Sequence, residues 1–83
     1  MNELNERQKT MVSDMKEDYM SNRENNAFAQ SLYMMIDELI DWNGTLYEQY
    51  ETFSEKEHVK IMRVFMDWAL ETEDVNKDWG RAE

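Results

Sequence analysis

The chain has 83 residues, no cysteine and no proline, and its 19 acidic against 9 basic side chains give a formal net charge of -10. The length limits it to one domain, and the lack of cysteine excludes disulfides and cysteine-based zinc sites. Because there is only one histidine, we expect no metal site and no cofactor. The negative charge repels phosphate groups, so direct binding to nucleic acid or to an anionic membrane is disfavoured.

Apolar residues recur at steps of three and four along the first twenty residues, which is the period of an amphipathic helix. We expect this helix to cover about residues 3–20, with opposite charges at helical spacing that leave its outer face roughly neutral. Its inward side is predicted to consist of Leu4, Gln8, Met11, Met15 and Tyr19, with Val12 on the flank.

Residues 21–24 have the capping-box spacing, in which a hydroxyl and a glutamate three residues later satisfy the first amides of a helix. They predict the start of a second helix that ends near Trp42, where Gly44 would adopt the left-handed conformation typical of a helix end. Its inward residues are predicted to be Phe28, Leu32, Met35, Ile36 and Leu39.

The same capping spacing occurs again at residues 45–48 and 54–57. The first predicts a short connecting helix, and the second predicts a last helix that reaches about Leu70 or Thr72. The inward side of this last helix is predicted to be His58, Ile61, Met62, Phe65, Trp68 and Ala69.

No segment alternates with a period of two for long enough to indicate a strand. The predicted fold is therefore all-α, a small bundle of three main helices plus a short connecting helix. Residues 1–83 are expected to form a single domain, with residues 73–83 as a flexible or loosely packed tail.

Acidic residues are concentrated between Arg23 and Lys56, where the chain has no basic residue. Asp37 and Asp41 lie one helical turn apart, and Asp41 is close to a helix end that disfavours negative charge. Because local stability does not favour this arrangement, we interpret it as a negative surface for a partner, with a solvated surface as the alternative. The predicted face contains Asp37, Glu38, Asp41, Glu48 and Glu51, with Tyr47 and Tyr50 as aromatic anchors.

A second candidate patch lies towards the C-terminal end of the sequence, where acids surround a tryptophan. It consists of Glu71, Glu73, Asp74, Asp78 and Trp79. The last predicted helix also has a basic stripe that would pair with acids of a neighbouring helix or of a second copy. This stripe is formed by Lys56, Lys60 and Arg63.

No arrangement typical of catalysis is present. His58 lies on the apolar side of its predicted helix, where a single histidine is typical of a core edge. Neither a nucleophile motif nor a glycine-rich phosphate loop accompanies it. We therefore expect that the protein is not an enzyme.

Size, charge and helicity together predict a small acidic binding protein that inhibits a basic, nucleic-acid-handling protein such as a nuclease or defence effector. Carboxylates one helical turn apart are separated by ~5–6 Å, which roughly resembles phosphate spacing and allows DNA mimicry. By this analogy alone the chain is similar to phage-encoded inhibitors of host defence or host enzymes. The first 26 residues contain no apolar run, so we expect a cytoplasmic location. The alternative is a homo-oligomeric helical adaptor, such as a homodimer, without nucleic-acid mimicry.

Overall fold

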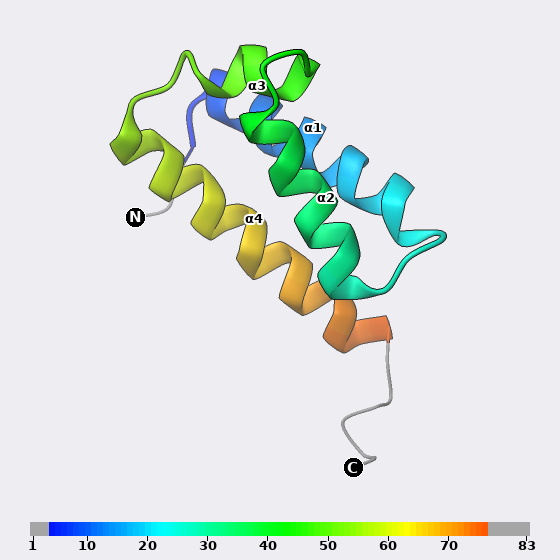
Figure 1. Ribbon diagram of the computed structural model, residues 1–83. Helices are drawn as coiled ribbons and strands as arrows, with labels where there is room; N and C mark the ends of the chain where they lie inside the picture. The colour runs from blue at the N-terminus through cyan, green and yellow to red at the C-terminus, as the bar shows by residue number, and fades with distance from the viewer. Residues whose placement is uncertain (1–3, 77–83) are drawn as a thin grey trace.

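The computed structural model describes residues 4–76, which form four α-helices and no strand (Figure 1). The helices are α1 (Glu6–Arg23), α2 (Phe28–Ile40), α3 (Thr45–Tyr50) and α4 (Glu55–Asn76). Helix α2 runs back along α1, α3 crosses one end, and α4 runs in the same direction as α1. The predicted bundle of three main helices and a short connecting helix is confirmed.

Helix α1 is the centre of the bundle. It packs against each of the other three helices, whereas α2 and α4 approach each other less closely. Within residues 4–76, no helix is long and apolar enough to cross a membrane.

All four helices and the α3–α4 connection contribute to one apolar core. Tyr19, near the end of α1, is almost completely buried, and its ring meets the rings of Phe28, Phe65 and Trp68 edge to face at centroid distances of 6.3, 5.8 and 5.7 Å. These contacts hold α1, α2 and α4 together. The buried apolar residues are Met11, Val12, Met15, Tyr19, Met35, Leu39, Leu46, Phe53, Ile61, Phe65 and Ala69.

Two helices begin with reciprocal capping hydrogen bonds. The predicted box before α4 is confirmed, because Glu57 N donates to Ser54 Oγ at 3.2 Å and Ser54 N donates to Glu57 Oε1 at 2.9 Å. Helix α1 uses amide side chains for the same purpose: Gln8 N donates to Asn5 Oδ1 at 2.8 Å, and Asn5 N donates to Gln8 Oε1 at 3.0 Å. This unpredicted cap explains why α1 begins at Glu6.

The connection between α1 and α2 differs from the sequence prediction. Residues 21–24 do not start a helix, since α1 continues to Arg23 and α2 begins only at Phe28. Asn22 Nδ2 donates to the carbonyl of Asp18 one turn earlier, at 2.9 Å, which satisfies the end of α1. The first turn of α2 has no side-chain cap at its N-terminus.

The turn after α2 also differs from the prediction. Helix α2 ends at Ile40, and Gly44 is the N-cap of α3, with an extended backbone (φ -89°, ψ 148°) instead of a left-handed one. Thr45 is the first residue of α3 and makes no capping bond. Glycine is favoured at position 44 by close approach, because a Cβ atom would lie 2.9 Å from Glu38 Oε1 and 3.2 Å from the Glu38 carbonyl oxygen.

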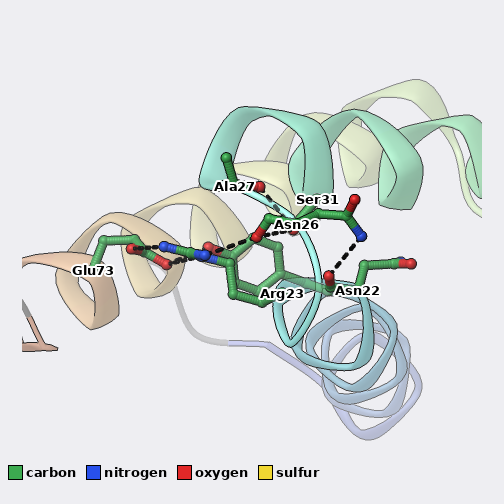
Figure 2. Close-up of polar contacts among 7 residues, drawn as sticks. Asn22, Arg23, Asn26, Ala27, Ser31 and Glu73 are labelled. Carbon is green, nitrogen blue, oxygen red and sulfur yellow. Dashed lines mark hydrogen bonds and ion pairs between the residues drawn. The ribbon is translucent and has the colours of Figure 1, made fainter.

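Helix α4 extends beyond the predicted end, through Asn76. Residues 73–76, which we expected to begin a loose tail, continue this helix. Figure 2 shows the reason: Arg23, at the end of α1, reaches across to Glu73 and also to the carbonyl of Asn26 in the α1–α2 connection. A contact between residues fifty positions apart therefore stabilises both helix ends.

Candidate functional site: an acidic depression between α1, α2 and α3

The predicted acidic face of α2 is divided by the fold. Asp37 and Asp41 are exposed, and the Asp41 carboxylate accepts the backbone amide of Asn43 at 3.1 Å. Glu38 is half-buried and lines an open depression of about 310 Å³. The other lining residues are Asp14, Glu17, Asp18, Thr45, Leu46 and Gln49.

We call this feature the acidic depression. Its carboxylates come from two helices: Asp14, Glu17 and Asp18 are three and four positions apart on α1, so they share one side of that helix. Glu38 on α2 lies across from them. The third wall comes from α3, where Gln49 Nε2 donates to Asp14 Oδ2 at 2.7 Å. Four carboxylates therefore surround the depression, and none of its lining residues is basic.

The depression makes negative charge unfavourable. Burial raises the pKa of the Glu38 carboxyl above its ordinary value, and repulsion by neighbouring carboxylates raises it further; those neighbours are Asp18, Asp41 and Asp37. Burial also raises the pKa of Asp18. A cation bound between these groups would stabilise their charged forms.

We expect Glu38→Gln to increase the free energy of unfolding at neutral pH by about 0.5 kcal/mol, since it removes a carboxylate that its neighbours repel. A raised pKa in the folded state means that the folded protein binds the extra proton more tightly. The contribution of Glu38 to stability is therefore lost as pH rises above the ordinary value of 4.5. Thermal unfolding at several pH values should show that stability declines less steeply with rising pH in the variant than in the wild-type protein. The same pH profile in both proteins would contradict this prediction.

The predicted aromatic anchors do not line the acidic depression. The Tyr50 ring stacks on His58 with a centroid distance of 3.9 Å and an interplanar angle of 9°, and His58 Nε2 lies 2.6 Å from the Tyr50 carbonyl oxygen. Burial raises the pKa of Tyr50. Tyr50 thus connects α3 to α4, and Tyr47 on the same short helix is half-buried.

Glu48 and Glu51 are exposed on α3 and its end, outside the acidic depression. Glu48 borders a separate depression next to Arg7 and Phe53. The Arg7 guanidinium lies 4.4 Å above the Phe53 ring, so this second depression also has a basic group. The structure therefore does not gather the predicted face into one uniformly negative site.

The second candidate patch is also divided. Glu71 is exposed, but Glu73 is only 9% exposed, and its side chain contacts Tyr19 and Arg23 inside the bundle. Glu73 thus stabilises the fold and is not presented to a partner. The side chain of Asp74 and the whole of Asp78 and Trp79 lie outside the described residues.

Sequence reasoning missed the contribution of α1 to the acidic depression. The sequence does contain a signal, namely three acids at positions 14, 17 and 18, but opposite charges on α1 suggested a neutral outer face. Only the pairing of α1 with α2 brings Glu38 to them. Among the described side chains, no group of three or more histidines and carboxylates is arranged to hold a metal ion.

The chain matches no protein family model, no curated protein and no solved structure.

Proposed function

We propose that this protein binds a basic protein through the acidic depression and inhibits it by covering a surface that otherwise binds nucleic acid. The observation that supports this proposal is the convergence of Asp14, Glu17, Asp18 and Glu38 around one open depression without a basic lining residue. Such an arrangement favours an arginine or lysine side chain of a partner, because an opposite charge relieves the repulsion between these carboxylates.

The chemistry of the depression favours arginine in particular. A guanidinium group donates hydrogen bonds in a fork that matches carboxylate oxygens, and it is less strongly hydrated than an ammonium group. The net charge of -10 attracts a basic surface over a longer range and accelerates the encounter. Proteins that act on nucleic acid carry such basic surfaces. A surface covered by this protein is no longer available to phosphate groups, which is the proposed mechanism of inhibition.

The test begins with affinity capture from a bacterial lysate by the tagged protein, followed by measurement of the Kd for the captured protein. The triple variant Asp14→Asn/Asp18→Asn/Glu38→Gln keeps the shape of the depression and removes three charges. We expect this variant to bind at least about tenfold more weakly. Nucleic acid should compete with the wild-type protein for the captured partner. The activity of that partner on nucleic acid should fall when the wild-type protein is added.

A matched control changes three exposed acids elsewhere, as Glu24→Gln/Asp67→Asn/Glu71→Gln. Both triple variants have the same net charge, so a general effect of charge would weaken them equally. We expect the control to retain nearly wild-type affinity. Equal losses of affinity in the two triple variants would count against the proposal. So would a captured protein that binds nucleic acid equally well in the presence of the wild-type protein.

A further inference from the structure

Helices α2 and α4 expose apolar side chains on the same face of the bundle. On α2 the side chains of Tyr33 and Ile40 are 66% and 65% exposed. At 100° per residue, the apolar side chains of each helix fall within one narrow sector beside its buried row. We call this surface the α2/α4 face; it consists of Ala29, Tyr33, Ile36 and Ile40 on α2 and Val59, Met62, Met66 and Leu70 on α4.

The contacts with α1 show that both sectors point the same way. On α2, Glu38 lies towards α1 at the acidic depression. On α4, Glu57 accepts a hydrogen bond from Gln8 of α1 at 3.0 Å, and Trp68 packs against Tyr19 of α1. The exposed apolar sectors lie on the other side of the buried rows. The α2/α4 face is therefore directed away from α1 and away from the acidic depression.

The α2/α4 face has a depression, and an exposed tryptophan lies near the end of α2. The depression has a volume of about 490 Å³ and lies at the N-terminal half of α4, where its lining includes Tyr50, His58, Val59 and Met62. Trp42 directly follows α2 and is 81% exposed, more than any other large apolar side chain of the described residues. A mostly apolar depression and an exposed indole ring are complementary in size and polarity.

Charges of opposite sign border the two apolar sectors. Asp37 on α2, and Asp41 directly after its last residue, lie beyond the apolar sector, on the outer edge of the helix. On α4 the corresponding outer edge is basic in its N-terminal half, with Lys56, Lys60 and Arg63, before Asp67 follows one turn later. None of these three basic side chains forms a salt bridge with a carboxylate of the described residues. Each helix thus presents an apolar sector with an edge that is complementary to the edge of the other helix.

We propose that a second copy of this chain covers the α2/α4 face in a two-fold symmetric dimer. Two arrangements satisfy the symmetry: α2 packs either on α2 of the second copy or on its α4. The first brings the outer edge of α2 against the same edge of its copy, and since α2 contains no basic residue, Asp37 and Asp41 find no opposite charge there. The second brings them against the basic edge of α4. Charge therefore selects the arrangement in which α2 packs antiparallel on α4 of the second copy, with the two-fold axis parallel to the helices.

This axis also determines which residues meet. A rotation about an axis parallel to the helices leaves each residue at its own level along the bundle. The end of α2 lies towards the same end of the bundle as the N-terminal half of α4, and the short α3 joins the two helices there (Figure 1). Asp37 and Asp41 consequently face the N-terminal half of α4 in the second copy, where the basic edge lies. Trp42 follows the same end of α2, and in the proposed dimer it is the exposed side chain expected to fill the apolar depression of the second copy.

Analytical ultracentrifugation of four samples tests the dimer. The wild-type protein should sediment with twice the 10.1 kDa mass of the chain. The variants Asp37→Lys/Asp41→Lys and Lys56→Glu/Lys60→Glu each place like charges together, so each alone should self-associate about a hundredfold more weakly. An equal mixture of the two restores opposite charges at both edges and should form a one-to-one heterodimer. All four changed residues are exposed or half-exposed, and circular dichroism of each variant should give the wild-type helix content.

Two further variants, each with a shortened apolar side chain, test the role of Trp42. Trp42→Ala should weaken the dimer, whereas Met20→Ala, which shortens an exposed side chain on α1, should leave it unchanged. A wild-type protein that stays monomeric at millimolar concentration would overturn the proposal, as would a mixture that fails to associate. Neutralising the acidic depression should leave the dimer intact, so loss of partner binding and loss of the dimer are separate outcomes.

Discussion

Glu73→Ala is expected to lower the free energy of unfolding by about 3 kcal/mol, which is the scale for removing one partner of a buried ion pair. The Glu73 carboxylate accepts hydrogen bonds from Tyr19 Oη at 2.6 Å, from Arg23 Nε at 2.8 Å and from Arg23 Nη2 at 2.9 Å. Its removal leaves the Arg23 guanidinium half-buried without a counter-charge. Because a domain of this size has a total stability of only ~3–5 kcal/mol, the variant should be largely unfolded at 37 °C.

Glu71→Ala is the matched control, since Glu71 is exposed two positions earlier on the same helix. We expect a change within about 0.5 kcal/mol for this control. Arg23→Ala combined with Glu73→Ala should destabilise less than the sum of the single changes, because the double variant leaves no unpaired charge. Urea denaturation gives all four values, and equal effects of Glu71→Ala and Glu73→Ala would show that the buried pair contributes nothing.

Tyr19→Ala is expected to have the largest effect of any single change, about 4 kcal/mol, because it removes the ring on which three other aromatic rings pack. Tyr19→Phe keeps the ring and removes only the hydroxyl that donates to Glu73. A hydrogen bond to a charged group contributes about 2 kcal/mol. The difference between the two variants therefore separates ring packing from the hydrogen bond.

The tyrosine hydroxyl also provides a spectroscopic check of this prediction. Burial and the hydrogen bond to Glu73 together raise the pKa of Tyr19 to about 12. Because the folded state holds this proton more tightly than the unfolded state, stability should fall as pH rises from about 10 to about 12. Tyr19→Phe should lose this part of the alkaline decline in stability. Ultraviolet difference absorbance records the corresponding ionisation of the tyrosine hydroxyl. A profile identical to that of the wild-type protein would contradict the assignment.

The sequence predicted the helices well where a repeated pattern determines them. Apolar spacing identified the inward side of α1, of which Gln8, Met11, Met15 and Tyr19 are buried. The ends of helices were harder to predict, because distant contacts determine them. Arg23 extends α1 by binding Glu73, fifty positions away, and no local pattern contains that information. The capping spacing at residues 21–24 was therefore misleading, whereas the same spacing before α4 is a true cap.

The candidate site was predictable only in part for a related reason. A local excess of acids drew attention to α2, and Glu38 does line the acidic depression. Its neighbours Asp14 and Asp18 come from α1, and the sequence gives no direct measure of which sides of two helices meet. Position along a helix likewise could not separate Glu38 from Asp37, although adjacent residues point about 100° apart and belong to different surfaces here.

The lack of a side chain at Gly44, in the turn after α2, affects the position of a carboxylate in the acidic depression. Its two hydrogens leave the space in which the Glu38 carboxylate lies, since a methyl group there would come within 2.9 Å of Glu38 Oε1. An alanine at this position would displace that flexible carboxylate more readily than it would move the nearby carbonyl groups. The geometry of the acids can therefore change without the loss or gain of any charge. Under the proposed function, one uncharged residue in a turn would thus tune which basic side chain the acidic depression accepts.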